Sequence, residues 1–243
     1  MQQQQGERRR FVIIGGGPAG TTCATHAARM GAEVTMIERD IVGGAAHLLD
    51  CIPSKAMIAT GGAMSLMADA AKMGLAHVEV KLDFEALRHR ITAIEERLEV
   101  STTELLESQG VRIIEGTGRL LSPHQVEATA TDGTVSVLDA DVVVLATGSR
   151  PRIPDWAGVD GERVLTTRHA YPPPELPKHL IVVGSGVTGV EFVHMFNSFG
   201  SDVSLIVSRR QVLPGKDPEV AAVLEQSFID RGVKLVFGAR ATG

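Results

Sequence analysis

The sequence has few cysteines, few aromatic residues and no long apolar segment. Two cysteines in 243 residues exclude a small secreted fold held by several disulfides and favour a reducing compartment. No run of about 18 apolar residues is free of both glycine and charge, so no integral membrane segment is expected. The net charge of −5 argues against a nucleic-acid-binding protein, which needs clustered cations to neutralise phosphates.

The first ten residues, MQQQQGERRR, are polar and basic and lack the apolar core of a signal peptide. We expect a disordered tail over residues 1–10 and a cytoplasmic location. The chain is long enough for one large or two ordinary domains. Its hydrophobic content of 44% and charged content of 22% are typical of a globular protein.

A dinucleotide-binding fingerprint follows the tail. The pattern predicts a strand over 11–14, a glycine turn, a helix over 21–30 and a second strand over 32–37. Glu38 ends this unit, 23 residues after the first glycine, where an acid binds the ribose hydroxyls of a dinucleotide. The alternative is a glycine-rich loop that only turns the chain. The candidate cofactor-binding residues are Gly15, Gly17, Pro18, Ala19, Gly20 and Glu38.

In the middle of the chain, the sequence pattern predicts two helices and a group of strands. The first helix covers 54–73, with an irregularity at Gly61-Gly62, and the second is amphipathic and covers 84–107. The strands are expected at 111–118, where a turn follows, then as an antiparallel pair within 125–141 and as an apolar strand over 141–146. The proline-rich segment 151–177 favours a linker.

A second fingerprint begins with a predicted strand over 179–183 and continues with a glycine turn, a helix over 190–199 and a strand over 203–207. A further helix (218–231) and strand (233–237) follow. Ser208-Arg209-Arg210 stand where a site specific for NAD would have an acid. Arginine binds a 2′-phosphate in a bidentate manner, so we predict that NADPH is used; the alternative is that both arginines point to solvent. The remaining candidate NAD(P)-binding residues are Gly184, Gly186, Val187, Thr188 and Gly189.

Two fingerprints predict two dinucleotide sites and an α/β fold with two Rossmann-like domains of three-layer ββα type. We expect the first domain over 11–153 and an incomplete second domain over 154–243. No metal site is predicted.

The stretch 43–55, GGAAHLLDCIPSK, resembles the active-site helix of the flavoprotein disulfide reductases, such as lipoamide dehydrogenase, glutathione reductase and mercuric reductase. Their pattern is G-G-T-C-x-x-x-x-C-I-P-S-K. Cys51 matches the second cysteine, but Ala46 stands at the first, so the redox disulfide cannot form. In this respect the chain resembles the lipoamide-dehydrogenase-like NAD(P)H:quinone reductases that lack the first cysteine.

The resemblance implies that the first site holds FAD. It implies that Cys51 lies against the flavin and that Lys55 lies near its reactive nitrogen, paired across the domain boundary with Glu191. The alternatives are a buried structural thiol for Cys51 and a solvated helix charge for Glu191. Cys23, in the first helix, is expected to be structural. Further FAD-binding residues implied by the resemblance are Gly43, Gly44, Gly116, Thr117, Ala146, Thr147, Gly148 and Ser149.

The function implied is that of an FAD-dependent NAD(P)H oxidoreductase that passes hydride from NAD(P)H to FAD and then electrons directly to a quinone-type acceptor. The alternatives are a dihydrolipoyl dehydrogenase-type disulfide reductase and a catalytically silent nucleotide-binding redox sensor. Members of this family have a longer chain that ends in a dimerisation domain. We therefore expect the sequence to be part of a longer protein that forms a homodimer.

Overall fold

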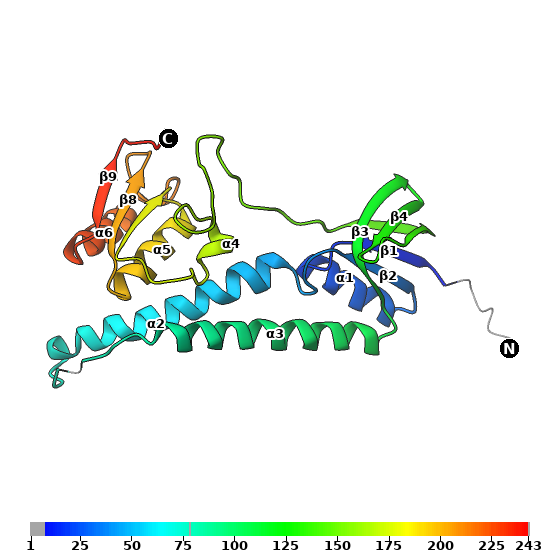
Figure 1. The fold of residues 1–243 in the computed structure, drawn as a ribbon, viewed down its shortest axis with the longest axis horizontal. Coiled ribbons are helices and arrows are strands. Elements are labelled where there is room, and N and C mark those ends of the chain that lie inside the picture. Colours follow the sequence, from blue (N-terminus) through cyan, green and yellow to red (C-terminus); the bar gives the residue numbers. More distant parts are fainter. Residues whose placement is uncertain (1–7, 78, 243) are drawn as a thin grey trace. The chain divides into compact units, whose positions relative to one another are not determined.

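The computed structural model describes residues 8–77 and 79–242 of the chain (Figure 1). The chain divides into two compact units. The first contains the described residues up to Ile52 together with Thr92–Arg150, and the second contains Pro53–Ile91 together with the described residues from Pro151 onward. Each unit contains one glycine fingerprint between a strand and a helix, so the predicted α/β fold is confirmed.

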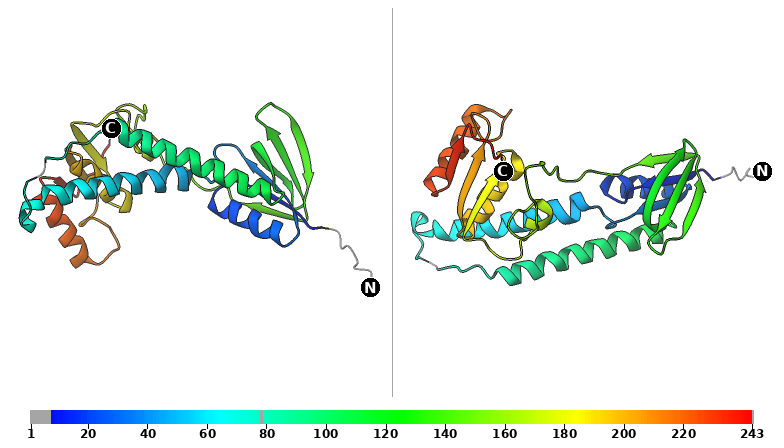
Figure 2. Two further views of the ribbon diagram at one scale, coloured as in Figure 1. Left: turned by 90° about the horizontal axis from the view of Figure 1, so that it is seen from below. Right: turned by 45° about the horizontal axis from the view of Figure 1, so that its top comes forward.

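The first unit is built on a six-stranded mixed sheet in the order β5-β4-β3-β2-β1-β6. Strands β3, β2, β1 and β6 are parallel, whereas β3, β4 and β5 pair in antiparallel fashion (Figure 2, green strands). Because β1 lies between two parallel neighbours, its residues 12–14 are buried, as their continuous apolar run predicts. The strands are β1 (Arg10–Ile14), β2 (Glu33–Glu38), β3 (Arg112–Ser122), β4 (Gln125–Ala130), β5 (Val135–Asp139) and β6 (Val142–Leu145).

Helix α1 (Pro18–Arg29) follows β1 and buries Ala24 and Ala27 in a core shared with Val34 and Met36 of β2. Helix α3 (Phe84–Ser108) begins in the second unit and ends in the first. It stops before Gly110, whose φ of +76° is the left-handed conformation that commonly follows a helix. A short π-helix, Ala46–Cys51, leads directly into α2 (Ile52–Ala68).

The second unit contains a three-stranded parallel sheet in the order β7-β8-β9. Its core combines apolar residues of β8 with Phe196, Phe228 and, from α2, the fully buried Met57. Because Met57 lies in this core, most of α2 belongs to the second unit. The elements are β7 (His179–Val183), α5 (Val187–Ser198), β8 (Asp202–Val207), α6 (Pro218–Asp230), β9 (Lys234–Phe237), the short helix α4 (Thr167–Ala170) and a 3-10 turn at Ala70–Met73.

Two local predictions are wrong, and both concern glycines. β3 does not turn at Gly118 but continues to Ser122, and a Cβ on Gly118 would lie 3.0 Å from the Ile14 side chain. Helix α2 runs without a break through Gly61, where a Cβ would lie 3.2 Å from the Cβ of Ser198. In both cases the glycine permits close packing of a regular element and does not interrupt it.

Candidate functional site

The first glycine turn is packed so closely that side chains would not fit. Gly15 has a φ of +108°, and a Cβ there would lie 2.2 Å from the carbonyl oxygen of Ala146. A Cβ on Gly20 would lie 1.9 Å from the carbonyl oxygen of Gly15. Helix α1 starts directly after the turn, and its N-cap, Gly17, makes no side-chain capping bond. The first N–H groups of α1 are therefore suited to a pyrophosphate.

Glu38 lies beside this turn at the end of β2. Its Oε2 accepts a 2.6 Å hydrogen bond from the Gly16 N–H, and its Oε1 accepts a 2.7 Å bond from the Asp40 N–H. These two bonds fix the direction of the carboxylate. A carboxylate has about four acceptor positions, so Glu38 is still able to accept hydroxyl protons from a ribose.

A second loop reaches the same turn through Gly43 and Gly44. The Gly43 N–H donates a 2.8 Å hydrogen bond to the Gly16 carbonyl oxygen, and a Cβ on Gly44 would lie 2.3 Å from the Gly17 Cα. Both loop glycines have positive φ, +103° and +82°. Apart from the ring of Pro18, which a Cβ on Gly44 would approach to 3.1 Å, backbone atoms make this approach, so the residues fit the pyrophosphate of a dinucleotide.

The other predicted FAD-binding residues follow the strands next to this turn. The Ala146 N–H donates a 2.8 Å hydrogen bond to the Ile14 carbonyl oxygen, which brings the segment 146–149 to the edge where the glycine turn begins. β2 pairs with β3 only as far as Glu115. Beyond that point Gly116 and Thr117 pair with β4, and among the described residues no strand pairs with their other edge. Thr117 is exposed, whereas Gly116 is buried.

The stretch that resembles a redox-disulfide site forms the π-helix of the first unit. Ala46 and Cys51 are both exposed, whereas Leu48 between them is fully buried. Both cysteines of the chain lie in its described part, and they form no disulfide. Cys23 packs against the core below α1, as predicted. Short π-helical segments often occur at functional sites, and here one exposes the thiol of Cys51.

Lys55 and Glu191 form the predicted ion pair. Lys55 Nζ lies 2.8 Å from Glu191 Oε1, although the two residues are 136 positions apart. Lys55 Nζ also lies 3.4 Å from Ser54 Oγ. We predicted a pair that joins two domains; in the structure both residues belong to the second unit, because α2 packs against α5 there.

The second glycine turn repeats the geometry of the first. Gly184 has a φ of +113°, and a Cβ on Gly189 would again lie 1.9 Å from the carbonyl oxygen of the first glycine. Helix α5 starts after Gly186, which likewise makes no side-chain capping bond. In contrast to the first turn, a Cβ on Gly184 would meet no described atom within 4 Å. The next residue, Ser185, is buried, and its carbonyl oxygen accepts a 2.7 Å hydrogen bond from the Leu213 N–H.

The carboxyl ends of β8 and β9 form an open cavity of about 590 Å³. It is lined by Ser208, Arg209 and Arg210, which the sequence predicted, and by Phe237 and Gly238, which it did not. Phe237 is the last residue of β9, and the carboxyl ends of parallel strands meet at one edge of a sheet. The predicted strand over 233–237 thus marks this edge in the sequence, but the strand pattern does not distinguish a residue that lines a site from one that packs in the core.

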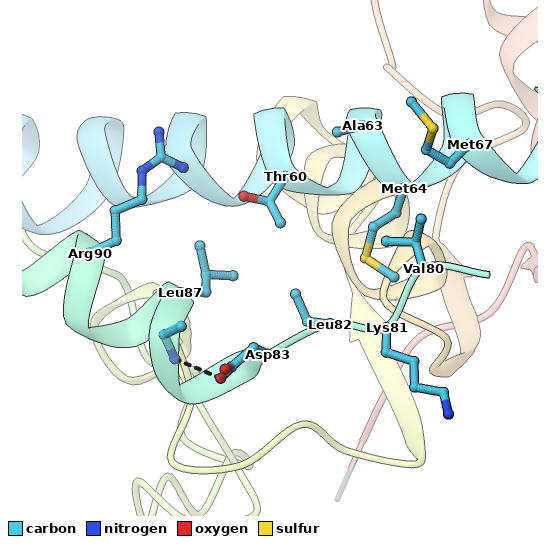
Figure 3. A pocket seen from close by; sticks show the side chains of 11 residues that line it. Thr60, Ala63, Met64, Met67, Val80, Lys81, Leu82, Asp83, Leu87 and Arg90 are labelled. Atoms are coloured by element: carbon cyan, nitrogen blue, oxygen red, sulfur yellow. Dashed lines mark hydrogen bonds between the residues drawn. The ribbon is translucent and has the colours of Figure 1, made fainter. Parts of the chain in front are cut away.

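Another cavity, of about 330 Å³, lies between α2 and the start of α3 (Figure 3). Its walls are mainly apolar, and none of the predicted site residues lines it. The cavity is lined by Thr60, Ala63, Met64, Met67, Val80, Lys81, Leu82, Asp83, Ala86, Leu87 and Arg90.

None of the described helices combines the length and apolar character needed to cross a bilayer.

Known proteins have a similar fold and a similar sequence. The model of the family "Pyridine nucleotide-disulphide oxidoreductase" matches residues 9–243. An NAD(P)H dehydrogenase (quinone) from Mycobacterium tuberculosis is 44% identical over 96% of this chain and 49% of its own. A dihydrolipoyl dehydrogenase from Zymomonas mobilis is 32% identical over 93% of this chain and 48% of its own. The crystal structure of LpdA from M. tuberculosis has a TM-score of 0.88 at 42% identity, over 97% of this chain and 52% of that one.

The chain thus spans about half the length of the curated relatives it matches. The resemblance predicted from the stretch 43–55 is confirmed, and it extends over nearly the whole chain. The family also supports the two predicted cofactors, FAD and NAD(P)H. On the strength of this match, the chain belongs to the pyridine nucleotide-disulphide oxidoreductase family.

Proposed function

We propose that the protein is an FAD-dependent NAD(P)H oxidoreductase that reduces a quinone-type acceptor without a redox disulfide. The observation that supports this most directly is Ala46, exposed at the position of the first redox cysteine in a stretch that otherwise keeps the family pattern. When bound, FAD would take a hydride from NAD(P)H and return two electrons to the acceptor, so that NAD(P)H, one proton and a quinone give NAD(P)⁺ and a hydroquinone.

The absence of a second thiol limits the acceptors that this stretch can serve. Reduction of a disulfide substrate proceeds through a mixed disulfide that another thiol must resolve. Position 46 holds alanine and not a second thiol, and Cys23 is packed in the core of the first unit. A small electrophile such as a quinone needs no thiol exchange. The 44%-identical relative named NAD(P)H dehydrogenase (quinone) supports the same class of acceptor.

The ion pair of Lys55 and Glu191 supports the proposed electron transfer. An ammonium group beside a flavin stabilises its anionic reduced form, as the resemblance implies for Lys55. The 2.8 Å contact with Glu191 holds the ammonium group in one direction. The Lys55 side chain is 62% exposed and that of Glu191 24% exposed, and exposed ion pairs contribute only about 0.2–1 kcal/mol. We therefore assign the pair a catalytic and not a stabilising role.

The cavity at β8 and β9 supports NADPH as the electron donor. Ser208 provides no negative charge that would repel a 2′-phosphate, and Arg209 and Arg210 line the same cavity. We propose that the two guanidinium groups bind this phosphate and that the N-terminus of α5 faces the pyrophosphate. The protein would accept NADH less well.

The test is NAD(P)H oxidation by the protein expressed from its complete reading frame, with a soluble quinone or with lipoamide as acceptor. We expect turnover with the quinone and none with lipoamide. Turnover with lipoamide would show that another thiol replaces the missing one and would favour a dihydrolipoyl dehydrogenase activity, the name of the 32%-identical relative. Purified protein without bound flavin or pyridine-nucleotide oxidation would favour a silent nucleotide-binding sensor. A homodimer located in the cytoplasm completes the proposal.

A further inference from the structure

The position of Lys55 needs an explanation beyond its ion pair. The Lys55 side chain of this pair is exposed and that of Glu191 is half-buried, and a pair with an exposed partner holds two long side chains only weakly. Lys55 lies near the start of α2 and Glu191 near the start of α5. What fixes the ammonium group is therefore the packing of these two helices against each other within the second unit.

One face of α2 makes this packing. Ser54, Met57 and Gly61 are buried, and Ser65 is half-buried; their spacing of three and four residues places them on a single helical face. Met57 and, from α5, Met195 are fully buried and lie in the same core. At Gly61 the helices are in close contact, because a Cβ there would lie 3.2 Å from the Ser198 Cβ and 3.6 Å from the Met195 Cα.

Ser198, near the end of α5, closes this contact with a full set of hydrogen bonds. Its hydroxyl donates to the His194 carbonyl oxygen at 2.7 Å and accepts a 2.8 Å bond from Arg231 Nη2. Ser65 Oγ lies 2.9 Å away. Because a hydroxyl has one proton and that of Ser198 is already used, Ser65 must be the donor. Arg231 in turn accepts a 3.3 Å bond from Asn197 through its carbonyl oxygen.

These contacts fix α2 on α5 at two levels. Lys55 meets Glu191 near the start of both helices, and Gly61 and Ser65 meet Ser198 further along, so the helices run in the same direction. The two levels are separated by six residues on α2 and seven on α5, about 9 Å and about 10.5 Å at 1.5 Å per residue. Two contacts at matching distances prevent both sliding and rotation of α2.

We propose that Gly61 and Ser198 are positioning residues for electron transfer: their close contact holds α2 in the register that keeps Lys55 on Glu191. The inference rests on the proposed role of Lys55 and adds the residues that set its place. A larger side chain at position 61 has no space against Ser198 and must push α2 away. A displacement of a catalytic group by about 1 Å is enough to lower the reaction rate roughly 100-fold.

The neighbouring glycine provides a matched control. Gly62 lies in the same helix, but a Cβ there would meet no described atom within 4 Å. Gly61→Leu and Gly62→Leu change helix propensity and apolar volume equally, and only the former pushes against α5. In the full-length holoenzyme we expect Gly61→Leu to lower kcat by about 10- to 100-fold and Gly62→Leu to change it by less than about twofold.

A second set of measurements separates positioning from a merely structural role. Gly61→Leu should shift the midpoint potential of the bound flavin in the same direction as Lys55→Met, and it should increase hydrogen exchange in α2. In the double variant Lys55→Met/Gly61→Leu, kcat should equal that of Lys55→Met alone, because the lysine to be positioned is missing. An unchanged potential in Gly61→Leu, or losses that multiply in the double variant, would overturn the proposal.

Two further outcomes have defined meanings. If Gly61→Leu does not fold, the milder pair Gly61→Ala and Gly62→Ala replaces it, since a Cβ at 61 already comes within 3.2 Å of Ser198; identical flavin potentials and exchange rates in this pair would refute the positioning role. If Lys55→Met itself leaves kcat and the potential unchanged, the proposed role of Lys55 fails. If Lys55→Met lowers both and the Gly61 variants do not, only the positioning inference fails.

Discussion

Replacement of Gly44 by alanine tests the FAD site most directly. The new Cβ would lie 2.3 Å from the Gly17 Cα, where two carbon atoms need about 3.5–4.0 Å, so the loop must move by more than about 1 Å. Overpacking of this kind costs about 1–3 kcal/mol. The positive φ of +82° adds a backbone cost of about 1–2 kcal/mol.

The variant Gly31→Ala separates the cost of overpacking from the cost of the backbone conformation. Gly31 belongs to the same unit and has a φ of +89°, but a Cβ there would meet no described atom within 4 Å. Both variants should lose similar stability through the backbone. Only Gly44→Ala should weaken FAD binding, and about 1–3 kcal/mol corresponds to a roughly 5- to 150-fold higher Kd.

The assay is fluorescence titration of flavin-free full-length protein with FAD, together with thermal unfolding of each variant. The expected result is a raised Kd in Gly44→Ala, with that of Gly31→Ala within about twofold of the parent protein. Equal FAD affinities in the two variants would refute the assignment of Gly44 and Gly17 to the cofactor site. The unfolding measurement excludes a general loss of structure as the cause.

Three further predictions concern the donor, the thiol and the pH. Arg209→Ala and Arg210→Ala together should raise the KM for NADPH by at least about 100-fold and leave the KM for NADH unchanged, because two charged bonds are lost and each costs about 1.5–3 kcal/mol; an unchanged KM for NADPH would contradict the assignment. Cys51→Ser should keep quinone turnover within about threefold in steady-state assays, whereas a loss near 100-fold would show that the thiol takes part. Burial, and then the nearby guanidinium of Arg231, lowers the pKa of His194 below its usual 6.5. The unfolded chain then binds a proton at a higher pH than the folded one, so stability should fall as the pH drops below about 6.5. Thermal unfolding at several pH values should show a smaller fall in His194→Gln, and an equal fall would refute this.

The parts of the fold predicted correctly from the sequence are those fixed by local geometry. The turns at Gly15 and Gly184 are required by positive φ, and Gly20 and Gly189 by contact with a carbonyl only five residues away. Such constraints appear in the sequence as fixed spacing. The Lys55–Glu191 contact was predicted from the family resemblance, because no local pattern relates residues 136 positions apart.

The errors arise where the reason for a residue is distant in the sequence. A glycine within a helix indicates an irregularity when only neighbours in sequence are considered. The actual requirement at Gly61 comes from Ser198 on α5, and that at Gly118 from Ile14 on β1. Phe237 was missed because an aromatic residue at the end of a strand is equally compatible with core packing. Tertiary contacts alone distinguish these cases.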